Sequence, residues 1–387
     1  MNREFLPFGK PNFSDAEIEA VTRVMRSGWV GMGAETLAFE KELAESIGAP
    51  HVVTVSSCTA AMFLSLLVQG IGPGDEVICP SLTWCSTANV ALYLGATPVF
   101  CDVDPETLCV TPELIRQKLS SKTRAVMVVH LAGLAVDTEP LRSVLPPSVV
   151  IIEDGAHALG ATYPGGRQVG SSGNLTSFSF YANKNLSTGE GGAIALADGS
   201  LAERLASLRQ HGLPIDAWKR FMQPNKLLTA QLSELGYKMN YTDLQACIGR
   251  VQLRRQPEFH ARRLEIARYY FKRLSEIPGV RFQSGSLQDS HSRHLYVLRL
   301  PIERMSISRD NLVLEMRERK IGASIHYAPL HRMPLYASKG CPAARLPATE
   351  QICQEIFTLP ISASMTLDDA VWVSDNLIEL LRRHLRS

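Results

Sequence analysis

Residues 149–157 read Val-Val-Ile-Ile-Glu-Asp-Gly-Ala-His, a short apolar run that ends in two carboxylates and a glycine. A continuous apolar run of this length is typical of a strand that helices cover on both faces. Similar runs recur through the first 250 residues and alternate with helical patterns. We therefore expect a large α/β domain with a mostly parallel sheet.

The other strands of this domain are predicted on both sides of that run along the chain. They are His51–Val55, Glu76–Cys79, Thr97–Cys101, Ala125–His130, Ser177–Phe180 and Gly192–Leu196. Helices are expected at 15–25, at Phe39–Ser46 and at Ala60–Val68, and Gly28 is a stop signal after the first of them.

A helical pattern at Asp243–Ile277 follows and indicates a long connector between two units. The segments predicted beyond it are a strand at His294–Leu300, a helix at Arg309–Arg319, a strand at Ala323–His326 and a closing helix at Asp368–His384. We expect a large α/β domain over residues 1–250 and a smaller C-terminal α+β domain over residues 251–387, which is an ordinary division for a chain of this length.

The 387 residues are 45% apolar and 20% charged, as in ordinary globular proteins. Lys and Arg number 40 against 38 Asp and Glu, without a long run of one sign, so nucleic acid is not an expected partner. Neither a signal peptide nor a membrane-crossing segment is evident, so we expect a cytoplasmic protein with no membrane partner. The eight cysteines lack the paired spacing of zinc or redox motifs, so no metal site is expected.

Residues 177–192, Ser-Phe-Ser-Phe-Tyr-Ala-Asn-Lys-Asn-Leu-Ser-Thr-Gly-Glu-Gly-Gly, carry the most informative chemistry. An aromatic-rich strand delivers Lys184 into a loop of small residues and glycines, where backbone can approach a ligand closely. A lysine at such a place can form a Schiff base. Taken alone, Lys184 is better interpreted as a solvated surface lysine, and the neighbouring motifs change that interpretation.

The 149–157 run places Asp154 at the carboxyl end of a strand, where open α/β sheets bind their ligands. A carboxylate there suits a pyridinium nitrogen, because its charge keeps that nitrogen protonated and lets the ring accept electrons. His157, three residues later, could stack on such a ring or bond its phenolate oxygen. The alternative for Asp154 is a helix N-cap.

Two further segments add a phosphate site and an aromatic surface. Residues 56–62, Ser-Ser-Cys-Thr-Ala-Ala-Met, follow a strand and begin a helix, whose free N–H groups and dipole suit a phosphate. A capping turn without a ligand is the alternative. Trp84 lies in a loop after the strand at Glu76–Cys79 and could stack on a flat ring, or else serve as a core tryptophan.

In this order the motifs resemble the DegT/StrS family of nucleotide-sugar aminotransferases. The residues that carry the resemblance are Ser57-Cys58-Thr59, Thr83-Trp84, Glu153–His157, Phe178-Ser179-Phe180 with Lys184-Asn185, and Gly189-Glu190-Gly191-Gly192. The match continues through Gly236–Asp243 and His326–His331, and so covers nearly the whole chain. Within the family, Pro80–Asp104 and Gly212–Arg220 look most like the aminotransferases that form UDP-4-amino-4-deoxy-L-arabinose.

The resemblance implies a fold-type-I aminotransferase whose large domain binds pyridoxal 5'-phosphate, with Lys184 as the catalytic residue. It also implies a homodimer with shared active sites. The cofactor-binding residues that it implies are Cys58, Thr59, Trp84, Asp154, His157, Ser179 and Asn240. Asn240 would reach the phosphate in the neighbouring subunit, whereas the residues alone slightly favour a helix N-cap there. Cys58 and Gly155 depart from the family's usual glycine and alanine, but both are small.

The resemblance further implies substrate-binding residues outside the cofactor motifs, namely Gly28, Trp29, Arg220, His326 and His331. The expected reaction transfers an amino group from an amino acid, expected to be glutamate, to a keto-sugar nucleotide at carbon four of the sugar. Lys184 would serve first as covalent anchor and then as base and acid. Amination at carbon three, amination of another cyclic ketone, and a non-catalytic cofactor-binding regulator stay open as alternatives.

Overall fold

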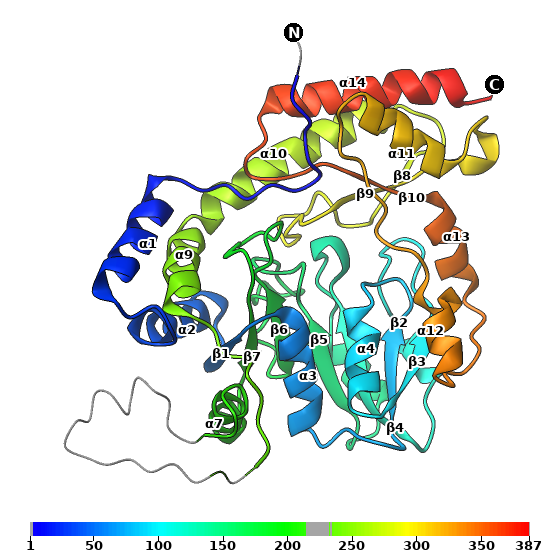
Figure 1. Cartoon of the computed structure of the whole chain (residues 1–387). Coiled ribbons are helices and arrows are strands. Elements are labelled where there is room, and N and C mark those ends of the chain that lie inside the picture. Colours follow the sequence, from blue (N-terminus) through cyan, green and yellow to red (C-terminus); the bar gives the residue numbers. More distant parts are fainter. Residues whose placement is uncertain (1–2, 214–231, 233, 387) are drawn as a thin grey trace.

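The computed structural model describes residues 3–213, 232 and 234–386 (Figure 1). Within these residues, the centre is a seven-stranded sheet of order β1-β7-β6-β5-β4-β2-β3. Its strands are β1 (His51–Val55), β2 (Glu76–Pro80), β3 (Thr97–Cys101), β4 (Thr123–Val129), β5 (Val150–Asp154), β6 (Leu175–Ser179) and β7 (Gly192–Leu196). β7 pairs antiparallel with β1 and β6, whereas the other neighbouring strands are parallel. The prediction of a mostly parallel sheet is confirmed.

Helices cover both faces of this sheet and also form a layer beyond its upper edge in Figure 1. They are α1 (Asp15–Ser27), α2 (Ala34–Ile47), α3 (Cys58–Val68), α4 (Ser86–Tyr93), α5 (Pro112–Arg116), α6 (Glu139–Val144), α7 (Gly199–Leu208), α9 (Asp243–Arg254), α10 (Gln256–Leu274), α11 (Arg309–Glu318), α12 (Pro334–Ser338), α13 (Pro347–Glu355) and α14 (Leu367–His384). No helix among the described residues is long and apolar enough to cross a membrane.

Strand β4 shows why apolar runs become strands in this position. Ala125 and Met127 pack into the core cluster that includes α3, whereas Val126 and Val128 pack into the cluster that includes α5 and α6. Alternate side chains of a strand point to opposite faces, so a strand between two helical layers must be apolar at every position. The same two clusters fix the strand ends that form the site.

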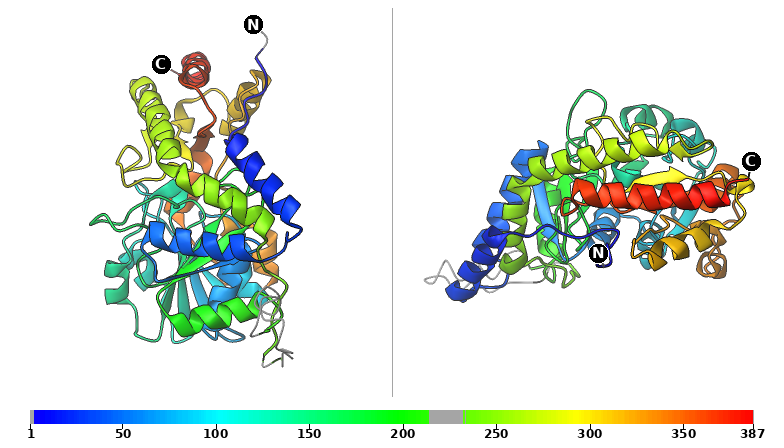
Figure 2. Two further views of the ribbon diagram at one scale, coloured as in Figure 1. Left: turned by 90° about the vertical axis from the view of Figure 1, so that its left-hand side faces the viewer. Right: turned by 90° about the horizontal axis from the view of Figure 1, so that it is seen from above.

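A second sheet lies beside the C-terminal helices. In the described part of the chain it has the order β10-β9-β8, with β8 (Arg281–Phe282), β9 (Tyr296–Arg299) and β10 (Ile356–Leu359) all antiparallel. Helices α10 and α14 pack side by side over it (Figure 2). Leu6 forms a bridge with Ile321, so the N-terminal arm also contacts this unit. The proposed boundary at residue 250 stays a prediction.

The predicted strand at Ala323–His326 is wrong. Ser324 pairs with Thr358 at a single bridge, and the N–H of Gly322 donates to Leu6 instead of joining a ladder. The regular strand beside β9 is β10, which the sequence analysis missed.

Two predicted helices differ from the structure in their bounds by more than two residues. The connector at 243–277 is divided into α9 and α10 at Arg255, because Pro257 stands in the first turn of α10 and lacks an N–H for a continuous helix. Helix α2 begins five residues before the predicted Phe39, at Ala34. Its start is capped by a distant side chain: Asp243 accepts hydrogen bonds from the N–H groups of Gly33 and Thr36 at 2.8 and 2.9 Å.

Candidate active site

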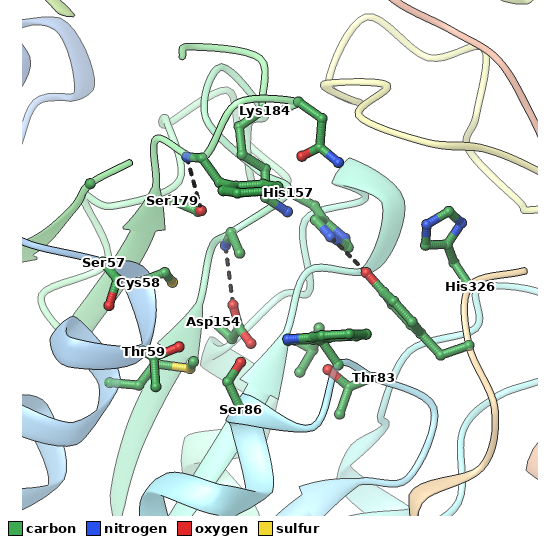
Figure 3. A pocket seen from close by; sticks show the side chains of 18 of the residues that line it. Ser57, Cys58, Thr59, Thr83, Ser86, Asp154, His157, Ser179, Lys184 and His326 are labelled. Carbon is green, nitrogen blue, oxygen red and sulfur yellow. Dashed lines mark hydrogen bonds between the residues drawn. The ribbon is translucent and has the colours of Figure 1, made fainter. Parts of the chain in front are cut away.

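The carboxyl ends of the parallel strands meet at one edge of the large sheet. A cavity of about 440 Å³ opens there, and β7, which runs the other way, brings its first residues to the same edge. Eight predicted site residues line this cavity: Cys58, Thr59, Trp84, Asp154, His157, Ser179, Lys184 and His326. Figure 3 labels all of them except Trp84. These residues come from five separate segments of the chain, so the fold assembles what the motifs only suggested.

Lys184 reaches the cavity from the loop after β6. As a residue it is only half-buried, because it lines the opening, but protein atoms surround its amine. Burial lowers the pKa of Lys184 from 10.5 to about 8, and interactions with Cys58 and Asp154 act in the other direction. The amine therefore loses its proton far more easily than that of a solvated lysine.

Asp154 is the last residue of β5 and is buried in the cavity floor. Thr87 Oγ1 donates to one carboxylate oxygen at 2.8 Å, and the N–H of Ala156 donates to the other at 3.1 Å. The Thr83 hydroxyl in turn lies 3.0 Å from that of Thr87. These donors hold the carboxylate in one orientation, facing the cavity.

The start of α3 forms another side of the cavity. Ser57 is its N-cap and accepts from the N–H of Ala60 at 3.1 Å, while the earlier N–H groups of the first turn have no acceptor within the helix. Gly192 packs so closely that an added Cβ would lie 2.5 Å from the carbonyl carbon of Ser57. Burial raises the pKa of the Cys58 thiol well above 9.0, so it brings no negative charge. This concave, positively polarised surface suits a phosphate.

Trp84 resolves an alternative that the sequence left open. Its side chain is 60% exposed and lines the cavity, so it is not a core tryptophan. A large apolar ring that faces an open cavity offers a surface on which a flat ligand can stack. Its ring centroid lies 5.9 Å from that of Tyr327, which forms the next part of the wall.

These features fit pyridoxal 5'-phosphate. The buried amine of Lys184 can bond its aldehyde, Asp154 can face its ring nitrogen, Trp84 can stack on its ring, and the first turn of α3 can hold its phosphate. Among the described residues, no group of three or more His, Cys, Asp or Glu side chains is placed to hold a metal ion.

The histidines around the amine are neutral. Burial, followed by the nearby charge of Lys184, lowers the pKa of His157 well below 6.5 and that of His326 to about 4. His157 Nδ1 accepts from the N–H of Ala132 at 3.2 Å, so its proton lies on Nε2, which is 3.2 Å from the Tyr327 hydroxyl. This wall of the cavity therefore supplies rings and hydrogen bonds without charge.

Four other predicted site residues, Gly28, Trp29, Asn240 and His331, lie outside the cavity of this chain. Asn240 donates to the carbonyl of Tyr241 at 3.2 Å, and the Trp29 indole donates to Met32 at 3.0 Å. Gly28 ends α1 with a positive φ of 74°, as its stop signal predicted. Arg220 lies outside the described residues.

His331 is buried five positions beyond His326 but does not line the cavity. Its Nδ1 lies 2.7 Å from Ser81 Oγ, and its Nε2 lies 3.1 Å from a carboxylate oxygen of Glu350. If His331 has its predicted role in substrate binding, it must act indirectly, through the loop that begins at Ser81.

Three residues of the site had no role in the sequence analysis. Thr87 anchors Asp154, His294 lies 3.3 Å from the Lys184 amine, and Tyr327 bonds His157. Tyr327 stands next to His326 in a motif that the sequence analysis had noted, which was a usable signal. Thr87 and His294 act through contacts between distant segments, for which no local pattern exists.

Comparisons with known proteins agree with this site. A sequence model of the DegT/DnrJ/EryC1/StrS aminotransferase family matches residues 11–378. The chain is 39% identical, over 98% of its length and 96% of the relative's, to the spore coat polysaccharide biosynthesis protein SpsC of Bacillus subtilis. The solved aminotransferase TlmJ from Streptoalloteichus hindustanus is 34% identical, with a TM-score of 0.88 over 98% and 99% of the two chains. A candidate sugar aminotransferase, Spr1654 of Streptococcus pneumoniae in its PMP form, is 30% identical, with a TM-score of 0.89 over the same shares.

The fold and the site together define a pyridoxal-phosphate-dependent aminotransferase of fold type I. The family match extends over nearly the whole chain, which confirms the predicted resemblance. The chain belongs to the DegT/DnrJ/EryC1/StrS aminotransferase family.

Proposed function

We propose that this enzyme transfers an amino group from glutamate to carbon four of a keto-sugar that is linked to a nucleotide. The observation that carries the sugar assignment is the chemistry of the cavity wall. Apart from Lys184, no lysine or arginine among the described residues lines it. Its other lining groups include the carboxylates of Asp154 and Glu190 and the rings of Trp84, His326 and Tyr327. Aromatic faces and neutral hydrogen-bonding groups suit a sugar ring, which is polar but uncharged.

The names of two relatives support a sugar substrate. SpsC acts in spore coat polysaccharide biosynthesis, and Spr1654 is a candidate sugar aminotransferase. The nucleotide, the aminated carbon and the amino donor rest on the resemblance of the motifs alone. Amination at carbon three is the alternative that the same motifs leave open.

The roles of the residues follow from their places. When bound, pyridoxal 5'-phosphate supplies an aldehyde that receives the amino group and a ring that accepts electrons. Asp154, held by Thr87, keeps the proton on the ring nitrogen. The first turn of α3 holds the phosphate, with the hydroxyls of Thr59 and Ser179 at the same side. Lys184 Nζ, with a pKa of about 8, can take a proton from the amino-bearing carbon and return it.

We also propose a homodimer in which the loop at 28–33 and Asn240 complete the partner's site. Asp243 accepts hydrogen bonds from the N–H groups of Gly33 and Thr36, which tie this loop to the segment after Asn240. Apolar side chains on and after α1 are exposed in the single chain: Ile18 (63%), Met25 (62%) and Val30 (43%). Exposed apolar groups next to such a unit are what a dimer interface would cover. Location in the cytoplasm stays a prediction.

The reaction is tested by converting the enzyme to its pyridoxamine form with glutamate and adding a panel of keto-sugar nucleotides. Recovery of the aldehyde cofactor's absorbance with a 4-keto-sugar nucleotide supports the proposal. Recovery of this absorbance with 3-keto-sugar nucleotides alone would show that the enzyme aminates carbon three. A cofactor that glutamate never converts would refute the proposed donor.

The shared site is tested by mixing Lys184→Ala with Asn240→Ala after verified subunit exchange. Some heterodimers then contain one site with both native residues, so activity should recover in part. The test requires that Asn240→Ala alone is folded and has lost most of its activity. A monomeric wild type in sedimentation, or no recovery, would return Asn240 to a local role beside the N-cap of α9.

A further inference from the structure

His294 is the side chain that meets the Lys184 amine, and the proposed function does not use it. Its Nε2 lies 3.3 Å from Lys184 Nζ, although the two residues are 110 positions apart in the sequence. His294 is buried, and its Nδ1 has no hydrogen-bond partner among the described residues. Within the described part of the chain, the buried His294 ring therefore forms its hydrogen bond with Lys184.

Hydrogen bonds hold the chain on both sides of His294. Asn185, next to Lys184, donates through Nδ2 to the carbonyl of Ser292 at 2.9 Å. Leu295 donates through its N–H to the carbonyl of Ala132 at 3.2 Å, and so ties the other side of His294 to the loop after β4. Because the chain on both sides of His294 is held in this way, the ring meets the lysine with a defined geometry.

The backbone beside His294 supports the same conclusion. Arg293 has a φ of 54°, in the left-handed region that non-glycine residues seldom adopt. Its carbonyl accepts from Arg263 Nη1 at 3.1 Å, and its guanidinium donates to the carbonyl of His291 at 2.7 Å. Strained backbone that several hydrogen bonds maintain is common at functional sites, because it places one side chain accurately.

We propose that His294 is a positioning residue for Lys184. Its Nε2 accepts an N–H of the lysine amine whenever that amine is not bonded to the cofactor, and so turns the remaining N–H groups and lone pair toward the cavity. The proposal rests on the proposed role of Lys184 as the lysine that bonds the cofactor. It adds a residue from the C-terminal part of the chain to a catalytic group of the large sheet.

The protonation of both groups fits this direction of the hydrogen bond. Burial, followed by the charge of Lys184, lowers the pKa of His294 well below 6.5, so the ring is neutral at pH 7. His157, Arg263 and His326 act on it in the same sense. A neutral imidazole has one accepting nitrogen, and an amine donates in both its protonated and its neutral form. An acceptor stabilises the protonated amine more, so its removal should lower the pKa of Lys184.

The test measures the Lys184 amine in the full-length apoenzyme, without turnover. The apoenzyme is labelled with trace acetic anhydride over a pH series around 8, and mass spectrometry quantifies the Lys184 peptide. His294→Leu removes the acceptor and should lower the pKa of Lys184 by about one unit, the size expected for a hydrogen bond to a charged group. His294→Gln, whose amide reaches to the place of Nε2, should restore most of the wild-type value.

Controls separate this role from a purely structural one. His51→Gln, at the exposed start of β1, should leave the pKa of Lys184 unchanged. Should His294→Leu fail to fold by circular dichroism, His294→Asn replaces it, because its shorter amide ends before the lysine. The proposal would be overturned if the pKa of Lys184 were unchanged or raised in the folded His294→Leu or His294→Asn variant. It would also be overturned if His294→Gln gave the same Lys184 pKa as that variant.

A separate experiment tests whether Lys184 bonds the cofactor. Borohydride reduction of the wild-type enzyme with bound cofactor should attach the cofactor permanently to the Lys184 peptide. Absence of that product would refute the proposed function. Its presence, with no effect of His294 on the amine of the apoenzyme, would refute the positioning role alone.

Discussion

Two walls of one cavity are built in opposite ways. The large-sheet wall, defined by Ser57, Asp154 and Lys184, comes from strand ends and carries the charged groups. The C-terminal wall, defined by His326 and Tyr327, comes from an irregular segment beside the small sheet. His326 is neutral, as is the His294 ring that contacts Lys184. Under the proposed function, this difference means that the large sheet supplies the chemistry of the cofactor, while the C-terminal part orients what reacts with it.

The sharpest test of this division replaces Lys184. Lys184→Ala should reduce turnover by about 10⁴-fold or more, because both the covalent anchor and the proton-transferring amine are lost. The visible band of cofactor bonded to lysine should also be absent. Steady-state assays and absorbance spectra measure both effects, and retention of that band in the variant would show that another residue holds the cofactor.

A smaller loss is expected at Asp154. Asp154→Asn should leave cofactor bound but slow the single-turnover reaction with glutamate by about 10²-fold, since an uncharged partner no longer keeps the ring nitrogen protonated. Thr87→Val, which removes one donor to the same carboxylate, should cost only about fivefold. Single-turnover rates at the wild-type level in the Asn variant would contradict the ring-nitrogen role.

On the C-terminal wall the two half-reactions should separate. His326→Ala should raise KM for the keto-sugar nucleotide by about tenfold, and His331→Ala by a smaller factor, because His331 acts through its hydrogen bond to Ser81. The half-reaction with glutamate should keep its rate in both variants. Equal damage to both half-reactions would instead assign these histidines to the cofactor or to the fold, and would erase the contrast between the walls.

The last prediction is a modest pH dependence. Burial depresses the pKa of Lys184 to about 8, so the neutral amine that captures the cofactor increases as pH rises through 8. Capture by the apoenzyme should speed up about fivefold between pH 7 and pH 8. The unfolded chain keeps the lysine proton up to a higher pH, so this group also makes the apoenzyme more stable as pH rises from about 8 to 10.5.

That window can be measured by stopped-flow absorbance and by urea unfolding. Lys184→Met, which removes the titrating amine, serves as reference for the unfolding series. If the capture rate instead rose only as pH approached 10.5, the pKa of a solvated lysine, the result would contradict the buried environment of the amine.

The contrast between the walls also describes how much could be predicted from the sequence. Strands buried on both faces are mostly apolar, and β1, β3 and β7 have the predicted bounds. Motifs at the carboxyl ends of the parallel strands meet at one edge of the sheet, and eight of the residues predicted for the site line the cavity there. These signals are local, and they decide most of the large-sheet wall.

The remaining features depend on contacts between distant segments. Strand β8 has only two residues and no period that a pattern could reveal. The role of His294 depends on its contact with Lys184, and nothing near residue 294 in the sequence points to residue 184. A lone histidine in a polar stretch is equally compatible with a surface or a core position, so its function becomes visible only in three dimensions.

The cap of α2 by Asp243 has a consequence for the order in which this enzyme is made. The carboxylate that completes the first turn of an early helix is more than 200 residues downstream, as its bonds to Gly33 and Thr36 show. The N-terminus of the chain leaves the ribosome first. Helix α2 and the loop before it therefore lack their cap until Asp243, the first residue of α9, has been synthesised. The central strands have all left the ribosome by then. We expect the outer N-terminal layer to dock late, onto a sheet that already exists, and a nascent chain stalled before residue 243 to lose this layer to protease while its strands stay protected.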